Sequence, residues 1–471
     1  MRKTKIIATL GPACADGEIL AGMIKAGMNV ARINMSHATH EEHASRIATV
    51  KKLRRDLSVP VALMLDTRGP EIRLGMFEND SAEVVAGDSF EIVNEPVTGN
   101  SHRASVSCAD FYKLLHKGDH LLINDGLIRM QVKEIADETV KLEVVIGGVI
   151  SNHKSINVPG VVLNMPYLSD QDKKDLLFGI QQDVDFIAAS FVSTANDIRV
   201  LKNFLLQNGG EHIEVIAKIE SSKGVDNIDE ILALADGIMV ARGDLGVEVP
   251  FVELPAIQKS LIKKARAAGK RVITATEMLE SMITKPRPTR AETSDVANAV
   301  YDGTGAIMLS GETAAGKYPV QAIKVMSAIA EYTESSIHYR KRFNMLSDFD
   351  LKTIADAMSA SAVKASYDLD CNAIIVATRS GRTAKLVSRF RPACPIIAVT
   401  TTEKAYYQLA LSWGVYPLQG AEQTDMSKVF EHAAQVARYF NAVKSGDTVV
   451  TVATTSGFNS DAMNIMRIDR I

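Results

Sequence analysis

Short apolar runs alternate with longer amphipathic segments along most of the chain. Eight of the runs have the length and β-branched content of buried strands, and most are followed by a segment with helical spacing. Parallel strands need helical crossovers, and eight strand–helix units are the number that closes a (β/α)8 barrel. The predicted strands are residues 6–10, 30–34, 61–66, 186–191, 215–220, 238–242, 272–276 and 307–310, and the clearest helices are 41–56, 195–207, 252–268 and 320–333.

The alternation is interrupted once, between about residues 70 and 170. This segment is rich in β-branched residues and carries turn signals at Gly87, Gly118 and Gly126, which predicts a small all-β domain of barrel type. Because it follows the third strand, it should hang from the carboxyl mouth of the barrel, where a hinged lid would cover a substrate. The alternative is a passive insertion.

A polar segment at 343–352 is typical of a linker, and a new strand–helix alternation follows it. There we expect helices at 354–367, 383–389, 403–411 and 426–440 and strands at 373–378, 396–400 and 448–453. The predicted fold is therefore α/β: a TIM barrel (residues 1–69 and 170–342), an inserted all-β lid (70–169) and a C-terminal open-sheet domain (343–471).

Composition narrows the function only a little. The 471 residues are 46% hydrophobic and carry a formal charge of -3, so no general affinity for nucleic acid is expected and any phosphate site must be local. The four cysteines lie far apart, which suits free thiols in a reducing compartment. The apolar start of the chain stops at Gly11 and Pro12, too short for a membrane span, so we expect a cytoplasmic protein without membrane contact.

Charged residues stand where two neighbouring strands end. The strand at 238–242 ends in Arg242, Gly243 and Asp244, and the strand before it ends in Lys218 and Glu220 on one face. Barrel enzymes place catalysis at these carboxyl ends. Two carboxylates beside a lysine favour Mg2+ or Mn2+ next to an anionic substrate, with a buried ion pair and a turn aspartate as the alternative.

The other strand ends are equally polar. Oxygen-bearing side chains after the second and third strands suit a weakly held monovalent cation, although the same residue types also cap helices. No His/Cys cluster points to zinc. The remaining strand-end residues are Arg32, Asn34, Ser36, His37, Asp66, Thr67, Arg68, Thr274, Thr276, Glu277, Ser310 and Glu312.

Two later turns resemble phosphate-binding loops. The first, 311–318, imitates a Walker A loop, but Tyr318 stands where Ser or Thr must hold Mg2+ and Pro319 follows, so no P-loop is expected. The second leaves a strand and enters a helix, which favours either an effector phosphate site or an ordinary capped helix. Its residues are Thr378, Ser380, Gly381, Arg382 and Thr383.

Taken together, these stretches resemble the pyruvate kinase family over nearly the whole chain. The motifs that carry the resemblance are TKIIATLGP, NVARINMSH, LDTRGPEIR, AKIE, MVARGDLGVE, ITATEMLESM, PRPTRAE and MLSGETAAGKYP. The resemblance implies transfer of the phosphoryl group of phosphoenolpyruvate to ADP, giving pyruvate and ATP, with Mg2+ (or Mn2+) and usually K+. It also implies a homotetramer regulated by a phosphorylated small molecule.

The resemblance also implies a role for each residue of the rim. Glu220 and Asp244 would bind Mg2+, and Lys218 would neutralise the phosphoryl group in flight. Glu71 stands at the position that the family links to K+ dependence. The other implied roles are phosphate binding by Arg32 and Arg73; binding of the substrate carboxylate by Gly243, Asp244 and Thr276; nucleotide binding by Asn34, His37 and Arg73; K+ binding by Asn34, Ser36, Asp66 and Thr67; and protonation through water near Thr276 and Ser310.

The chain departs from the family at four positions near these motifs and in its tail. The tail at 454–468 is shorter and less glycine-rich than the typical effector loop, which leaves the identity of the effector open. A pyruvate-enolate aldolase and a non-catalytic, ligand-sensing paralogue remain as alternatives. The four departures are Arg68 for a usual Lys, Glu277 for Gln, Gly305 for Asp and Ala315 for Lys.

Overall fold

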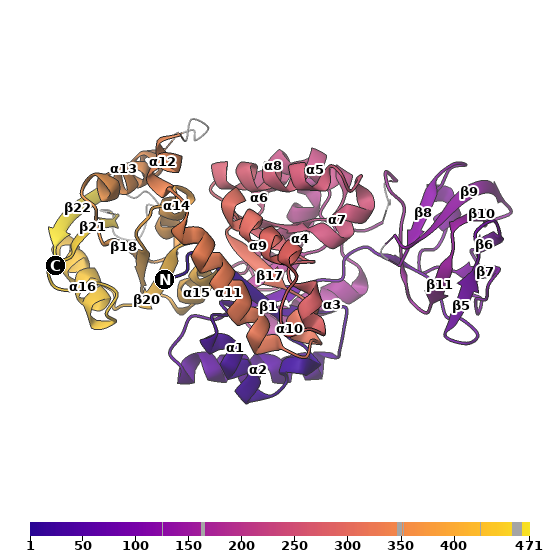
Figure 1. Cartoon of the computed structure of the whole chain (residues 1–471), viewed down its shortest axis with the longest axis horizontal. Coiled ribbons are helices and arrows are strands. Elements are labelled where there is room, and N and C mark those ends of the chain that lie inside the picture. Colours follow the sequence, from indigo (N-terminus) through magenta and orange to yellow (C-terminus); the bar gives the residue numbers. More distant parts are fainter. Residues whose placement is uncertain (125, 162–164, 346–350, 352, 424, 455–463) are drawn as a thin grey trace.

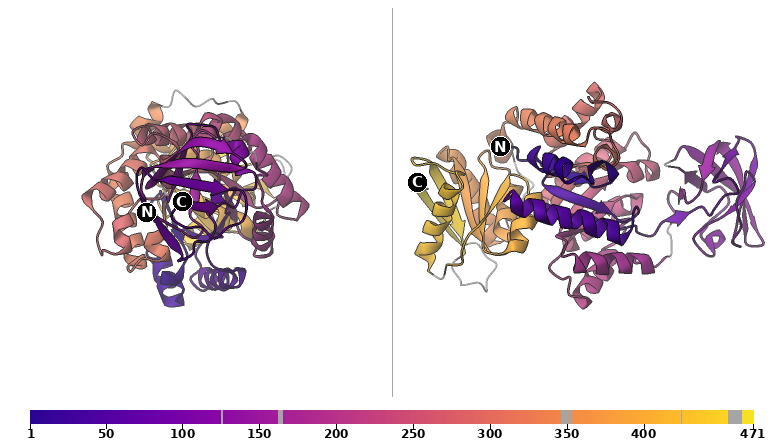
Figure 2. Two further views of the ribbon diagram at one scale, coloured as in Figure 1. Left: turned by 90° about the vertical axis from the view of Figure 1, so that its right-hand side faces the viewer. Right: turned by 90° about the horizontal axis from the view of Figure 1, so that it is seen from below.

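The computed structural model describes residues 1–124, 126–161, 165–345, 351, 353–423, 425–454 and 464–471. Three parts lie in a row, with a parallel barrel in the middle, a β-rich part at one end and an open-sheet part at the other (Figures 1 and 2). No helix within the described ranges is long and apolar enough to cross a membrane.

The central part is a closed parallel barrel of eight strands, as the sequence predicts. Its order is β1-β17-β16-β15-β14-β13-β3-β2, so β3 pairs with β13 across the inserted segment. Each strand begins and ends within two residues of its predicted bounds. The strands are β1 (Lys5–Thr9), β2 (Val30–Asn34), β3 (Ala62–Asp66), β13 (Phe186–Ala189), β14 (Glu214–Ile219), β15 (Gly237–Ala241), β16 (Arg271–Ala275) and β17 (Ala306–Leu309).

Helices surround the barrel, and several begin at capping boxes that the sequence carries. At the start of α2, the side chains of Thr39 and Glu42 each accept a hydrogen bond from the backbone N–H of the other residue. Thr289 and Glu292 do the same at the start of α9. The helices are α1 (Gly17–Lys25), α2 (His40–Asp56), α3 (Asp170–Gln181), α4 (Ala195–Gln207), α5 (Ser222–Asp226), α6 (Ile228–Leu234), α7 (Arg242–Glu248), α8 (Leu254–Ala267), α9 (Arg290–Asp302), α10 (Gly311–Ala314), α11 (Pro319–Ser335) and α12 (Tyr339–Asn344).

Period-two alternation along the strands builds two cores. Met239 packs with Ile216 and Ile273 in one cluster, whereas Ile238 and Val240 belong to the larger cluster that includes helix residues. The smaller cluster also contains Leu411 from the C-terminal part. The C-terminal part therefore packs against the end of the barrel opposite the catalytic rim.

The inserted segment is all-β and lies beyond the carboxyl end of β3. It forms a sheet in the order β4-β12-β8-β9-β10-β6-β7 and a separate ribbon of β11 and β5. The two edge strands of this sheet are β4 and β7. The residues that directly follow them, Leu74 and Val106, form an antiparallel bridge, so the two edges of the sheet come together as in a barrel. The strands are β4 (Ile72–Arg73), β5 (Ser81–Val84), β6 (Ser89–Val93), β7 (Arg103–Ser105), β8 (His120–Ile123), β9 (Ile128–Ala136), β10 (Thr139–Ile146), β11 (Gly148–Ser151) and β12 (Ser155–Asn157).

The C-terminal part is an open sheet in the order β20-β19-β18-β21-β22, with β22 antiparallel to β21. Neither β20 nor β22 is among the strands predicted from the sequence. Strand β20 contains Pro417, which is tolerated because β20 lies at the sheet edge. Most of the predicted linker and of the departing tail lies outside the described residues. The elements are α13 (Ile354–Asp368), β18 (Ala373–Thr378), α14 (Arg382–Arg389), β19 (Ile396–Thr400), α15 (Glu403–Gln408), β20 (Val415–Gln419), α16 (Met426–Tyr439), β21 (Thr448–Ala453) and β22 (Ile465–Arg470).

Candidate active site

A polar cavity of about 350 Å3 lies at the carboxyl rim of the barrel, where the lid joins it. Residues from β2, β3, β14 and α7 contribute to its wall, and residues at the base of the lid complete it. The structure therefore brings together residues that lie far apart in the sequence. Those predicted as site residues that line the cavity are Arg32, Asn34, Ser36, His37, Asp66, Thr67, Glu71, Arg73, Lys218, Glu220 and Asp244.

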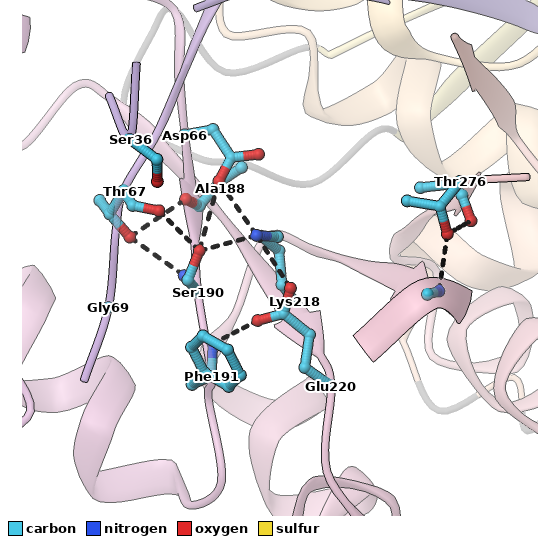
Figure 3. Close-up of polar contacts among 12 residues, drawn as sticks. Ser36, Asp66, Thr67, Gly69, Ala188, Ser190, Phe191, Lys218, Glu220 and Thr276 are labelled. Carbon is cyan, nitrogen blue, oxygen red and sulfur yellow. Dashed lines mark hydrogen bonds and ion pairs between the residues drawn. The ribbon is translucent and has the colours of Figure 1, made fainter. Parts of the chain in front are cut away.

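Lys218 lies at the centre of a buried charge cluster (Figure 3). Its Nζ lies 2.9 Å from Glu220 Oε1 and 3.1 Å from Asp66 Oδ1, and it donates a hydrogen bond of 2.7 Å to Ser190 Oγ. Burial by itself lowers the pKa of Lys218, but the two carboxylates outweigh it and raise this pKa above its usual value. Lys218 is therefore a fixed positive charge at neutral pH.

Asp66 joins Lys218 to Arg32. Its Oδ2 lies 2.5 Å from Arg32 Nε, and Arg32 Nη1 donates to Thr9 Oγ1 at 2.9 Å. Burial alone would raise the pKa of Asp66, yet the two cations lower it overall, so the carboxylate stays ionised. Both cations are thus held in place before any substrate arrives, which is the pre-organisation that phosphoryl transfer needs.

Glu220 is a buried carboxylate whose negative charge Lys218 balances only in part. Burial raises the pKa of Glu220 to about 7. The positive charge of Lys218 opposes this rise, and the negative charge of Asp244 adds to it. Its Oε2 accepts from Phe191 N at 2.6 Å, whereas Oε1 accepts no hydrogen bond from the described residues, although Lys218 Nζ lies 2.9 Å away. A divalent cation between Glu220 and Asp244 would remove this cost, and oxygen-only ligands fit Mg2+.

The part of the chain that the structure describes holds no group of three or more His, Cys, Asp or Glu residues that could bind a metal. The two carboxylates would therefore supply only part of a six-oxygen shell. Substrate oxygens and water would have to complete it.

Thr276, Gly243 and Arg242 form the next section of the rim. Gly243 N donates to Thr276 Oγ1 at 2.8 Å, and Thr276 has a positive φ of 66°, a strained conformation that is common at functional sites. Arg242 Nη2 donates to Thr276 O at 2.5 Å, and its Nη1 pairs with Asp295 at 2.7 Å. Arg242 thus supports the loop through Thr276, and the stretch after β15 forms α7 rather than an open turn.

Ser190 belongs to the site but is not among the site residues predicted from the sequence. It follows β13, is 1% exposed, accepts from Lys218 and donates to Thr67 O at 2.7 Å. Its backbone N donates to Thr67 Oγ1 at 3.1 Å. The signal was present, because Ser190 is the penultimate residue of the predicted strand 186–191 and so lies at its carboxyl end.

Two predicted residues lie at the edges of the site. Ser310 follows β17 and its N donates to Glu312 Oε2 at 2.7 Å, but Ser310 is not among the residues that line the cavity. Arg73 belongs to β4 at the base of the lid, forms an ion pair with Glu71 and donates to His153 O at 2.8 Å. Arg73 is therefore held by the inserted domain, whereas Lys218 belongs to the barrel strand β14.

The turn between β18 and α14 places Gly381 at the N-cap of α14, and no side chain in the described part of the chain caps the helix. Gly381 has a φ of 78° and donates its N–H to Thr378 Oγ1 at 3.1 Å. Arg382 and Thr383 form the first helical positions, and Thr383 is buried. Arg379 O accepts from Thr402 Oγ1 at 2.8 Å, which holds this turn against the next one.

The four departures from the family lie outside the Lys218 cluster. Arg68 Nε lies 3.3 Å from Asp175 Oδ2, Glu277 follows Thr276 with a φ of 53°, and Ala315 directly follows α10. Gly305 precedes β17 at the opposite end of the barrel, beside Arg391.

Fold and site together define a class of protein: a (β/α)8-barrel protein with an inserted all-β domain, whose rim holds two buried cations beside the carboxylates of Asp66 and Glu220. Family models for the pyruvate kinase barrel domain and the pyruvate kinase alpha/beta domain match residues 1–323 and 356–469. The chain belongs to the pyruvate kinase family.

Individual relatives agree with this assignment. The chain is 45% identical to a pyruvate kinase of Clostridium acetobutylicum over 469 residues, which cover 99% of both chains. It is 45% identical to one of Geobacillus stearothermophilus, covering 99% of this chain and 80% of the relative. A crystal structure of a pyruvate kinase from Cryptosporidium parvum superposes with a TM-score of 0.94 at 38% identity, covering 100% of this chain and 96% of the other.

Proposed function

We propose that the cavity at the barrel rim carries out the reaction of the pyruvate kinase family, transfer of the phosphoryl group of phosphoenolpyruvate to ADP. The supporting observation is the buried cluster of Lys218, Asp66 and Arg32 beside Glu220. It places two immobile cations, Lys218 and Arg32, next to a buried carboxylate whose Oε1 accepts no hydrogen bond from the described residues, which suits a phosphoryl group and its metal. An aldolase would need neither the inserted β domain nor the monovalent-cation residues, and a sensing paralogue would have no use for this cluster.

Each residue of the cluster has a definite part in the proposal. The Arg32 and Arg73 guanidiniums bind phosphate oxygens, and the Lys218 ammonium neutralises the phosphoryl oxygens while the bond to the enol oxygen breaks and the bond to ADP forms. Glu220 and Asp244 hold Mg2+ or Mn2+, which when bound acts as a Lewis acid on the substrate oxygens.

The remaining roles concern the substrate carboxylate and the proton. Gly243 and Asp244 amides and the Thr276 hydroxyl bind the carboxylate; Gly243 N and Thr276 Oγ1 lie 2.8 Å apart, which supports a shared role. After transfer, the enolate accepts a proton on its methylene carbon from water positioned near Thr276 and Ser310. Asn34, His37 and Arg73 contact the nucleotide.

We also propose a K+ site formed by Asn34, Ser36, Asp66 and Thr67. All four line the cavity, and carboxylate and neutral oxygens suit a large monovalent cation. Glu71 lies on the same wall, where burial raises its pKa and Arg73 opposes that effect. A carboxylate there adds negative charge without removing the need for the bound cation.

A coupled assay for pyruvate tests the proposed activity and its cation dependence. With phosphoenolpyruvate, ADP and Mg2+, we expect kcat to be about tenfold higher or more in K+ than in Na+ at equal ionic strength, a difference of about 1.4 kcal/mol. Equal rates in the two salts would contradict the K+ site. No ADP-dependent pyruvate in any salt would contradict the activity itself.

Regulation through the C-terminal part rests on the turn Thr378, Ser380, Gly381, Arg382 and Thr383. We expect Arg382→Ala to abolish activation by a phosphorylated effector while kcat at saturating substrate changes less than about twofold, because the turn lies far from the rim. A panel of sugar phosphates and AMP, titrated at low phosphoenolpyruvate, gives the readout. Unchanged activation would place the effector elsewhere. Light scattering on the same samples tests the proposed homotetramer.

A further inference from the structure

A second charged cavity, of about 30 Å3, lies at the opposite end of the barrel, between the starts of β16 and β17 and the C-terminal part. Neither the reaction nor the effector turn uses it. It lies between two parts of the protein that are joined in the chain only through the segment after α12. The cations that line it are Arg266, Lys270, Arg271, Lys385, Arg389 and Arg391.

Three of these cations form ion pairs with carboxylates. Glu214 pairs with Arg271 and lies 2.7 Å from Lys385 Nζ, and Asp356 lies 2.8 Å from Arg389 Nη1. Burial opposes the ionisation of Glu214, yet its two partners hold its pKa at about 2. Glu214 and Asp356 are therefore already paired with these three cations.

Arg391 lacks a comparable partner. It is 8% exposed, its Nη2 donates to Gly303 O at 2.8 Å, and its guanidinium lies 4.3 Å from the centre of the Trp413 ring. Its Nε and Nη1 have no hydrogen-bond partner in the described ranges of the chain, and neither has Nε of Arg266. A buried guanidinium whose donors are unsatisfied is costly unless an anion occupies the space beside it.

The backbone beside Arg391 leaves room for that anion. Gly305 has no side chain, and a Cβ at this position would lie 4.0 Å from Arg391 Nη2. An acidic residue at Gly305 would thus neutralise Arg391 from within the chain. Without it, the positive charge stays uncompensated.

We propose that this cavity binds a small oxyanion, the phosphate of either inorganic phosphate or a phosphate monoester, between Arg391 and Arg266. Two guanidiniums with unpaired N–H donors match the geometry of phosphate oxygens. The volume corresponds to about two or three waters, which suits an oxyanion group and excludes a whole nucleotide. The anion would join α8 of the barrel to the segment after α14 and stabilise the contact between the two parts.

The test compares Gly305→Asp with Gly305→Asn in the full-length protein. The two side chains are nearly isosteric, and both meet the same tight contact of 3.0 Å with Val272 O, so only the charge distinguishes them. We expect phosphate, replacing chloride at constant ionic strength, to raise the melting temperature of the unchanged protein and of Gly305→Asn by about 1–3 °C more than that of Gly305→Asp. In chloride alone, Gly305→Asp should melt higher than Gly305→Asn.

Because both variants retain the same rim and effector turn, phosphate bound at those sites cancels from the comparison. Equal phosphate responses in the two variants would overturn the proposal. Glycerol 3-phosphate in place of inorganic phosphate distinguishes the two sources: a difference between the variants with phosphate alone assigns the free ion, and a difference with both assigns a monoester-accepting site. Selenate soaked into crystals should give an anomalous peak beside Arg391, and a fully soaked crystal without that peak would also overturn it.

Discussion

Lys218→Met is expected to lower kcat by about a thousandfold or more while the affinity for phosphoenolpyruvate changes less than about threefold. The ammonium is fixed between Asp66 and Glu220, so it matters most when charge moves across the phosphoryl group in the transition state. A thousandfold loss corresponds to about 4 kcal/mol of transition-state stabilisation. Steady-state kinetics give kcat, and calorimetric titration of phosphoenolpyruvate gives the affinity.

The substitution also leaves two buried carboxylates facing each other, so thermal melting must accompany the kinetics and the assay temperature must lie below the transition. Lys223→Met is the matched control. Lys223 lies on α5, directly after the same strand, and lines a neighbouring cavity outside the charge cluster. We expect its kcat to stay within about twofold. If Lys218→Met raised only KM, the proposed role in the transition state would be wrong.

Glu220→Gln is expected to weaken binding of the divalent cation by about tenfold or more and to lower kcat at any fixed Mg2+ concentration. The amide keeps the size of the side chain and can still accept from Phe191 N, but it removes one of the two negative charges next to the cation. Mn2+ binding, followed by electron paramagnetic resonance in the absence of substrate, measures the affinity independently of turnover. Saturating Mg2+ should recover part of the lost rate.

Glu248→Gln provides the control for this second experiment. Glu248 ends α7 and lines the adjacent cavity with Asp244, and its burial raises its pKa as burial does for Glu220. It belongs to no part of the Lys218 cluster, so its substitution should leave Mn2+ binding unchanged. Equal Mn2+ affinities for Glu220→Gln and the unchanged protein would contradict the proposed ligand role.

Three features of the structure lie beyond the sequence patterns because they depend on neighbours that are far away along the chain. The edge position of β20 makes Pro417 acceptable, and that position is set only when β19 pairs with it. Ser190 was overlooked because a serine carries no strong signal until Lys218, 28 residues later, donates to it. Asp66, read as an oxygen ligand for K+, also forms ion pairs with Arg32 and Lys218.

The sequence by itself determined the order and type of the barrel elements and the polar character of the strand ends. Those features follow from hydrophobic spacing and from residue types over a few positions, which are local properties. Only the tertiary structure decided which of these residues meet. Pairing of β2 with β3 places Arg32 beside Asp66, 34 residues away, and packing of the C-terminal part against the barrel places Arg391 beside Gly303, 88 residues away, because burial and charge pairing depend on contacts that no local pattern specifies.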